Sequence, residues 1–342
     1  MGQVVRWGIL GAAGIAGGQF VPAVRAAGRS ELWTVAARDP ARARAFAAEH
    51  GAHRHHERYE DVLADPEVDA VYVALPNALH AEWTVAAARA GKPVVCEKPF
   101  AISAQEAVAV LGACRLAGVP CWENFVYRHH PQTARVQAWL NAGAIGQLRT
   151  VHASFHFTLR QPRRAIDIRM SAALAGGALM DVGCYPVSWL RTCFGEEPVS
   201  ASAVARVDPE HAVDTQMVGL LQFPGHRAGT FSCSFDAPGS PLTRLTGTEG
   251  EIEVSQPFHP RGSSATLTLR PSRGAPEVLS LALDEPPFTA FVRHVQECLL
   301  DGQSPRLTAE DAVGNMAAID ALQASAAAQG ATRPVLRFSP EG

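Results

Sequence analysis

Lys98 is the first side chain in this sequence whose type and surroundings suit proton transfer. It lies in Glu97-Lys98-Pro99, directly after the apolar run 94–96, and it is one of only two lysines among 30 basic residues. The pKa of a lysine shifts readily on partial burial, whereas an arginine stays charged. The sequence therefore indicates a functional lysine at the end of a strand, with a surface Lys-Pro turn as the alternative.

Asp181 and Tyr185 form a second candidate pair, within the stretch 176–186 (GGALMDVGCYP). Because proline fits only in a first helical turn, Pro186 predicts that a helix begins near Gly183 and continues to Phe194. The positive end of the helix dipole there would keep an aspartate ionised or lower the pKa of a phenol. A phenol with a lysine nearby can act as general acid–base for a carbonyl or a hydroxyl. In the alternative interpretation, Asp181 only caps the helix and Tyr185 only packs.

The N-terminal elements predict a dinucleotide-binding site. Residues 4–10 form an apolar strand, 11–18 a turn rich in glycine and alanine, and 19–27 a helix. These elements begin a βαβ unit whose helix N-terminus presents N–H groups to a pyrophosphate. Cofactor contacts are expected from Gly11, Ala13, Gly14, Ile15 and Ala16. Ala13 replaces the second glycine of the usual pattern, and a plain strand–helix corner is the alternative.

The end of the second strand, 32–37, bears on the choice of cofactor. An acidic residue at this place usually binds the ribose of NAD. Here the first side chain beyond the strand is Arg38, and Arg42 follows one helical turn later. Guanidinium groups suit the 2′-phosphate of NADP. We therefore expect NADP, while Asp39, directly after Arg38, keeps NAD open.

Two further strands bring polar side chains to the same edge of the predicted sheet. The apolar run 68–75 ends in Leu75 and is followed by Asn77 and His80, as the run 94–96 is followed by Glu97 and Lys98. Open α/β sheets bind ligands at the carboxyl ends of their strands, so all five residues are expected to contact the cofactor. Alternatively, Asn77 caps a helix and His80 is an ordinary residue of its first turn.

The alternation of strands and helices stops near residue 125, which predicts two domains. Residues 1–125 read as an α/β Rossmann domain with a doubly wound parallel sheet, and residues 126–342 as an α+β substrate-binding and dimerisation domain with a large, mainly antiparallel open sheet. Strands of the second domain are expected at 151–159, 199–207, 217–223, 229–235, 251–254 and 266–269, and closing helices at 288–301 and 309–328.

No metal site is predicted. His152 and His156 face the same side of the expected strand, but four residues span about 13 Å there, too far for both to bind one ion. One of them, His156, could instead hydrogen-bond a substrate. The histidines between 50 and 56 have no carboxylate or cysteine at ligand spacing and read as surface residues.

Composition excludes several classes of function. A net charge of −3 without clustered basic residues argues against nucleic-acid or anionic-membrane binding. No apolar run reaches the roughly 18 residues of a membrane span, and the N-terminus leads straight into a strand without a signal peptide. Seven cysteines without a CxxC pair fit reduced thiols, so a cytoplasmic location is expected.

Taken together, these motifs resemble the Gfo/Idh/MocA oxidoreductase family over nearly the whole chain. Glu97-Lys98-Pro99 at the end of the fifth strand is the most specific of them. Many members have histidine where Asp-x-x-x-Tyr here ends in Tyr185. This departure matches the branch with glucose–fructose oxidoreductase, dimeric dihydrodiol dehydrogenase and NADP-dependent D-xylose dehydrogenase. Arg169, a cofactor contact by this resemblance, and Tyr127 and Arg128, substrate contacts, also match that branch.

The resemblance implies an NADP-dependent dehydrogenase or reductase acting on CH–OH groups of a sugar or polyol. Tyr185 would exchange the proton of a sugar hydroxyl while hydride passes to or from the nicotinamide C4. Lys98 would hold that oxygen and depress the pKa of Tyr185, and Asp181 would orient the substrate or the pair. A homodimer or homotetramer would form through the C-terminal sheet.

Two other functions remain open. A tightly bound, recycled cofactor could serve a net non-redox reaction, such as that of a hydrolase or an isomerase. A regulatory protein that senses NADP without catalysis is the other, although the presence of Lys98, Asp181 and Tyr185 argues against it.

Overall fold

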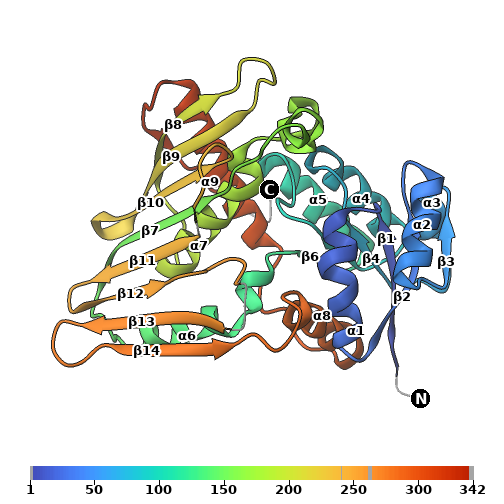
Figure 1. Cartoon of the computed structure of the whole chain (residues 1–342), viewed down its shortest axis with the longest axis horizontal. Helices are drawn as coiled ribbons and strands as arrows, with labels where there is room; N and C mark the ends of the chain where they lie inside the picture. Colours follow the sequence, from blue (N-terminus) through green and yellow to red (C-terminus); the bar gives the residue numbers. More distant parts are fainter. Residues whose placement is uncertain (1–2, 240, 261–263, 339–342) are drawn as a thin grey trace. The chain divides into compact units, whose positions relative to one another are not determined.

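The computed structural model describes residues 3–239, 241–260 and 264–338, and these residues form two compact units. The first unit comprises Met1–Val126 and Asp284–Ala312, and the second comprises Tyr127–Leu283 and Val313–Gly342. Figure 1 colours the chain from the first unit's blue strands to the red C-terminal helix. In the described part of the chain, no helix has the length and apolar character to cross a membrane.

A six-stranded parallel sheet with the order β3-β2-β1-β4-β5-β6 forms the centre of the first unit (Figure 1). This order is that of a doubly wound dinucleotide-binding fold, as predicted. Its strands are β1 Val5–Leu10, β2 Ser30–Ala36, β3 Arg54–His56, β4 Ala70–Val73, β5 Val94–Cys96 and β6 Cys121–Glu123. Its helices are α1 Val21–Ala26, α2 Pro40–His50, α3 Tyr59–Ala64, α4 His80–Arg89, α5 Ala104–Ala117 and α8 Thr289–Asp301.

Helix α8 shows that the boundary predicted from sequence is incomplete, because residues 284–312 belong to the first unit and not to the second. The apolar side chains Phe291, Val292 and Val295 are fully or almost fully buried in the cluster that α1 and β1 also line. Arg29 pairs with Asp301 at 2.9 Å. The predicted second domain, a continuous range 126–342, therefore wrongly includes α8, which packs in the first unit with the nucleotide-binding sheet.

The second unit is built on a nine-stranded sheet with the order β14-β13-β12-β11-β7-β10-β9-β8-β15. Only β7 and β10 pair in parallel, and the other pairs are antiparallel, in agreement with the predicted class. The strands are β7 Leu148–His156, β8 Ser200–Val207, β9 Asp214–Phe223, β10 Arg227–Ser234, β11 Leu242–Gly247, β12 Gly250–Val254, β13 Ser264–Pro271, β14 Glu277–Ala282 and β15 Arg333–Pro334.

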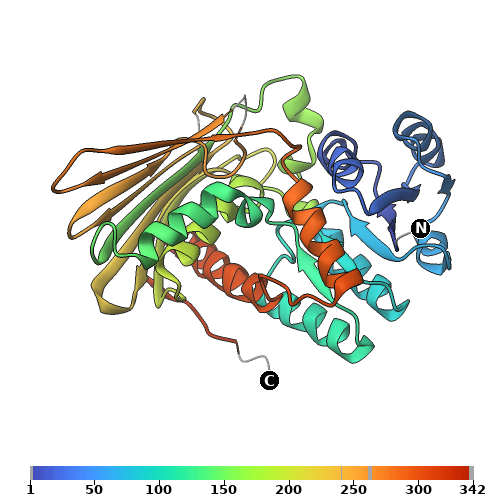
Figure 2. The same ribbon diagram turned by 90° about the horizontal axis from the view of Figure 1, so that it is seen from below.

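Helices cover one face of this sheet (Figure 2). They are α6 Pro131–Asn141, α7 Cys184–Phe194 and α9 Glu310–Ala327. Alternate strand residues such as Val151, Ala153 and Leu221 are buried beneath them. On the strands' outward positions several valines stay exposed, among them Val204 and Val218. The alternation of buried and exposed residues is that of a sheet with one covered face.

Candidate functional site

The glycine-rich turn after β1 leaves the start of the first helix open. Gly11 has φ +105°, and a Cβ there would lie 2.5 Å from the carbonyl oxygen of Ala74, so only glycine fits. The helix begins at Gly14, and its π-helical segment is Ala16–Phe20. Ala13, the residue before the helix, has no side-chain acceptor for the first N–H groups. Gly14 is exposed, and a Cβ on it would meet no atom within 4 Å. Uncapped N–H groups beside open space suit an anion.

The end of β2 distinguishes between the two forms of the cofactor. Arg38 is exposed, as expected of a phosphate ligand, whereas the carboxylate of Asp39 accepts the N–H of Ala41 at 2.9 Å and caps α2. Arg42 donates to the carbonyl of Ala12 in the glycine-rich turn at 3.0 Å. Asp39 is thus engaged in the helix cap, while two guanidinium groups flank the same edge.

Tyr59 is a member of this group that the sequence reading missed. Burial raises the pKa of its phenol, and a hydrogen bond with the backbone of Arg38 and the charges of Arg38 and Arg42 oppose that rise. Its ring packs edge-on against Trp83, with centroids 4.8 Å apart. Nothing in the sequence indicated this contact, because Tyr59 begins a short helix 21 residues after Arg38.

His80 is placed differently from the prediction. Its side chain is 1% exposed, with Nδ1 2.7 Å from the carbonyl oxygen of Pro99 and Nε2 2.8 Å from that of Leu75. Burial lowers its pKa, and the contacts of the two ring nitrogens with these carbonyls oppose that shift. The expected ligand contact is therefore replaced by a tie between the loops that follow β4 and β5. Asn77, in the 3₁₀ turn Asn77–Leu79, remains partly exposed.

The Glu97-Lys98 pair follows β5 at the same edge of the sheet. The carboxylate of Glu97 is buried and accepts hydrogen bonds from the Tyr72 hydroxyl and from Asn124 Nδ2, the latter at 2.5 Å. Desolvation raises the pKa of Glu97, and the adjacent charge of Lys98 opposes the rise. Glu97 is thus held inside the unit, whereas Lys98 is half-buried. Tyr72 and Asn124 were not anticipated as its partners.

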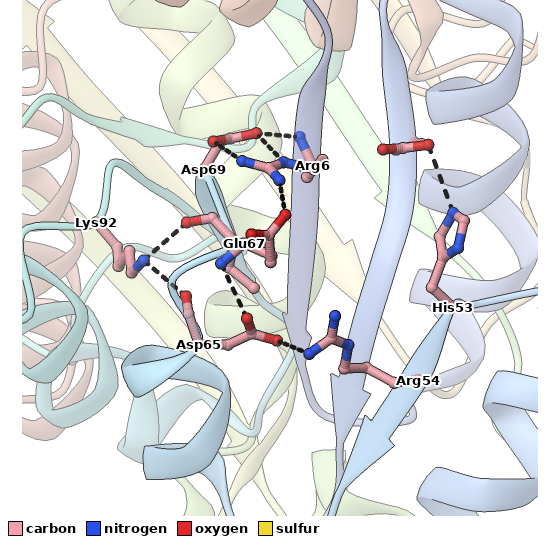
Figure 3. Close-up of polar contacts among 9 residues, drawn as sticks. Arg6, His53, Arg54, Asp65, Glu67, Asp69 and Lys92 are labelled. Carbon is pink, nitrogen blue, oxygen red and sulfur yellow. Dashed lines mark hydrogen bonds and ion pairs between the residues drawn. The ribbon is translucent and has the colours of Figure 1, made fainter.

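The other lysine, Lys92, has a purely structural place (Figure 3). Its Nζ donates to the carbonyls of Asp65 and Val68 at 2.9 and 2.8 Å. Beside it, Arg6 pairs with Glu67 and Asp69, and His53 reaches Glu31 at 3.5 Å. The contacts of Lys92 and Arg6 brace the amino-terminal ends of β1 and β4, and the His53–Glu31 contact joins those of β2 and β3. All of them lie away from the edge at which Lys98 lies. The two lysines of the chain therefore occupy opposite ends of the same sheet.

In the second unit, the helix that carries Asp181 and Tyr185 begins earlier than predicted. It starts at Ala178, passes through the π-helical segment Leu179–Gly183, and continues as α7. The prediction of a start near Gly183 was therefore wrong. Pro186 is the third residue of α7, shortly after the π-helical segment. The thiol of Cys184 donates to the carbonyl of Asp181 at 3.5 Å.

Asp181 is held by a cluster of charges. Arg169 Nε donates to Asp181 at 2.6 Å, and Arg169 Nη1 lies 3.1 Å from Asp167. The charge of Asp181, followed by that of Asp167, raises the pKa of the guanidinium. Within this unit Arg169 therefore acts on Asp181, and its expected cofactor contact remains a prediction.

Tyr185 lies in an aromatic cluster. Its side chain is 4% exposed, and its ring centroid is 5.0 Å from that of His259 and 5.5 Å from those of Phe155 and Phe258. Tyr127 packs behind it, with a ring separation of 6.1 Å. The cluster fixes the plane of the phenol. His259 and Phe258 come from the segment after β12, which the sequence reading did not connect with Tyr185.

Of the three residues expected to contact substrate, Tyr127 and His156 hydrogen-bond other side chains of the same unit. Tyr127 is 1% exposed, and its hydroxyl bonds Ser188 at 2.7 Å, so it supports α7 from inside. His156 donates to or accepts from Ser232 at 2.9 Å and alternates with Phe155, the residue that faces Tyr185. Because neighbouring strand residues point to opposite faces, His156 lies on the face away from Tyr185. Arg128 is partly buried, and its charge acts on Cys193.

Within the described ranges, no group of three or more histidine, cysteine, aspartate or glutamate side chains is arranged to hold a metal ion.

Comparison with known proteins gives matches over both units. Residues 5–125 match the model of an oxidoreductase family with an NAD-binding Rossmann fold, and residues 133–253 match the GFO/IDH/MocA C-terminal domain. D-xylose 1-dehydrogenase (NADP(+)) 2 from Haloferax volcanii is 39% identical over 94% of this chain and 97% of its own length. Trans-1,2-dihydrobenzene-1,2-diol dehydrogenase from Bos taurus is 32% identical over 88% of this chain and 90% of its own.

Among solved structures, a 3-ketoreductase from Actinomadura kijaniata, in complex with NADP and TDP-benzene, has a TM-score of 0.88 at 29% identity. The match covers 94% of this chain and 98% of that one. The family matches, the relatives and the shared fold agree with the glycine-rich turn, the Glu-Lys-Pro rim and the Asp-x-x-x-Tyr helix. The chain belongs to the Gfo/Idh/MocA family of oxidoreductases.

Proposed function

We propose that this chain is an NADP-dependent oxidoreductase that interconverts a hydroxyl and a carbonyl group on a sugar or polyol. The observation that carries the proposal is the placement of Tyr185: a phenol inside an aromatic cluster, on the same helix as an aspartate that Arg169 holds. A phenol so oriented is suited to general acid–base work on a substrate oxygen. The relatives named above supply the class of substrate.

The residues of the first unit fit NADP. The uncapped helix start after Gly11 suits the diphosphate, and exposed Arg38 with Arg42 suits the 2′-phosphate. The carboxylate of Asp39 would otherwise favour the ribose hydroxyl of NAD, and it is occupied by the N–H of Ala41. When bound, the cofactor supplies a nicotinamide C4 that accepts or donates hydride. Further contacts are proposed for Ala13, Gly14, Ile15, Ala16, Leu75 and Asn77.

Lys98 and Tyr185 are proposed to act on the same substrate oxygen. In the direction of oxidation, Tyr185 takes the proton of the hydroxyl, and in reduction it returns that proton. Lys98, a cation at the end of β5, stabilises the negative charge that develops on this oxygen. Asp181 orients the substrate or the pair, and its own position depends on Arg169.

The substrate class follows from the relatives' names, which include a D-xylose dehydrogenase, a dihydrobenzenediol dehydrogenase and a 3-ketoreductase. All three names describe chemistry at a carbon that bears a hydroxyl or a carbonyl group. Arg128 and His259 border the aromatic cluster or its helix, and we propose that they contribute to the choice among such substrates.

We further propose a cytoplasmic enzyme that assembles into a homodimer or homotetramer through the open face of the nine-stranded sheet. The exposed valines at 204, 218 and 278 support a contact there, and the seven free cysteines fit a reducing compartment. Light scattering during size-exclusion chromatography measures the oligomer. A monomer at micromolar concentration would contradict the proposed assembly.

The function is tested by screening aldoses, ketoses and vicinal diols with NADP and with NADPH, following the absorbance of the reduced nicotinamide. We expect turnover with at least one sugar or polyol and a preference for NADP over NAD. Tight NADP binding without turnover over the whole panel would contradict the proposal and favour a cofactor-sensing protein. Cofactor that stays bound during a net non-redox conversion would favour the hydrolase or isomerase type.

A further inference from the structure

The carboxylate of Asp214 closes the start of the helix that carries Asp181 and Tyr185. Asp214 begins β9, 35 residues after Leu179 in the sequence, and its Oδ2 accepts the N–H of that residue at 2.7 Å. The N–H of Ala178 is a second donor to the same carboxylate. The first N–H groups of a helix have no partner within the helix, so Asp214 supplies one from another element.

The double glycine before the helix is shaped around this contact. Gly177 has φ +109°, and a Cβ on it would lie 2.2 Å from Asp214 Oδ1. A Cβ on Gly176 would lie 2.3 Å from the carbonyl oxygen of Arg169, the residue that holds Asp181. Both glycines are therefore needed for the close approach of Asp214 on one side and of the Arg169 segment on the other.

We propose that Asp214 is a positioning residue for proton transfer, because its carboxylate fixes the turn from which Asp181 and Tyr185 extend. The inference rests on the proposed roles of those two residues. It adds that their alignment is set from β9, through hydrogen bonds to backbone N–H groups, and not by the helix alone. Asp214 touches neither substrate nor cofactor in this account.

The surroundings of Asp214 make the contact sensitive to pH. The ionisable group coupled to Asp214 is Cys233 on β10, whose thiol also feels Asp181 on the π-helical segment and Cys184 on α7. Burial raises the pKa of Asp214 to about 6, and the N–H groups of Leu179 and Ala178 oppose the rise. A protonated carboxyl is a weaker acceptor than a carboxylate, so the turn loosens as the pH falls through about 6.

The sign of the effect on global stability is opposite to the local one. A folded-state pKa above the unfolded value of about 3.9 means that the folded chain binds the proton more tightly. The contribution of this group to stability is therefore full below about pH 4 and is lost as the pH rises through the folded value of about 6. Protonation of Asp214 on acidification thus loosens the turn locally, but it does not lower the global stability of the folded chain. The difference separates a positioning role from a merely structural one.

Hydrogen exchange measured by mass spectrometry on the full chain tests the inference. After correction for intrinsic rates, we expect the peptide that covers 177–185 to exchange about fivefold to tenfold faster at about pH 5 than at about pH 7.5 in the wild type, the ratio expected when a charged acceptor becomes neutral. Asp214→Asn, which keeps an acceptor but cannot titrate, should remove this pH dependence. Glu210→Gln removes the same charge from an exposed position nearby and should behave as the wild type.

The activity profile provides the second readout. The acidic limb of kcat near pH 6 should be present in the wild type and in Glu210→Gln and absent in Asp214→Asn, with kcat at neutral pH reduced. Wild-type exchange that does not change with pH, or an Asp214→Asn variant that keeps the wild-type pH dependence, would overturn the inference. If Tyr185→Phe retained full turnover while the exchange result held, the proposed role of Tyr185 would fail, and Asp214 would remain only a pH-dependent cap of the turn.

Discussion

The two units each begin a functional helix with a glycine-rich turn and a π-helical segment, but they treat the helix start in opposite ways. After Gly11 the first helix has no side-chain cap, and Gly14 is open to its surroundings. After Gly177 the second helix is closed by the buried carboxylate of Asp214. The comparison indicates that an open start is kept for an external anion, whereas a closed start fixes the side chains that follow it.

Lys98 lies at the same edge of the sheet as the open start, and its removal should have the largest effect. Lys98→Met should lower kcat by about 10²–10⁴-fold, the range for loss of a group that acts in the transition state. NADP affinity measured by fluorescence titration should change little. Lys92→Met is the matched control, because that lysine donates only to backbone carbonyls at the far end of the sheet. Near-normal kcat in Lys98→Met would refute its assigned role.

Closing the open start should abolish cofactor binding without harming the fold. Gly14→Asp places a carboxylate beside the uncapped N–H groups, where it caps the helix but repels the diphosphate. We expect the Kd for NADP to rise at least about 100-fold by calorimetry, since like charges in contact cost several kcal/mol. The melting temperature should stay the same or rise. Unchanged affinity would show that the diphosphate binds elsewhere.

Arg38 should decide between the two forms of the cofactor. Arg38→Asp replaces the proposed phosphate ligand by an acceptor for a ribose hydroxyl, and the ratio of NADP to NAD affinity should fall by about 10–100-fold, the value of one or two charged contacts. Arg44→Asp, an exposed change on α2, the helix that follows Arg38, serves as the control. If Arg38→Asp left the ratio as in the wild type, the NADP assignment to this arginine would be incorrect.

Opening the closed start should affect stability more than binding. Gly177→Ala introduces strain at φ +109° and displaces the Asp214 carboxylate. A loss of about 1–3 kcal/mol in unfolding free energy is expected, measured by urea denaturation. NADP affinity should change less, because the turn carries none of the contacts proposed for the diphosphate or the 2′-phosphate. Gly112→Ala, inside α5 with free space at its Cβ, should be neutral or slightly stabilising; equal effects of both changes would contradict the role of the turn.

Local patterns predicted the fold of this chain well, because strands, glycine turns and helix caps leave their marks within a few residues. The Rossmann sheet and the mainly antiparallel sheet both follow from such marks. The predicted helix start near Gly183 was wrong because its cap, Asp214, lies far along the sequence. Residues 284–312 were misplaced for the same reason, since their packing partners are near the N-terminus.

Side-chain direction was harder to predict than position. His80 lies at the predicted edge, yet its ring points into the protein, toward the carbonyls of Leu75 and Pro99. His152 and His156 do share one face, where they contact Thr230 and Ser232. The two-residue period of a strand does not predict which face of the sheet the helices cover. His156 lies on the uncovered face, away from Tyr185. The carboxylate of Asp39 is taken by the cap of α2. Aspartate before the proline that opens a helix is a signal for this cap, and the prediction did not use it.

The central claim is that Tyr185, held on the closed helix, transfers the proton, and Tyr185→Phe tests it most directly. The phenyl ring keeps the packing against Phe155, Phe258 and His259 and removes only the hydroxyl. Turnover and NADP affinity are to be measured on the same preparation, with the best substrate of the screen. The account predicts a loss of about 10²–10⁴-fold in kcat with NADP binding unchanged; near-wild-type kcat in the phenylalanine variant would contradict it.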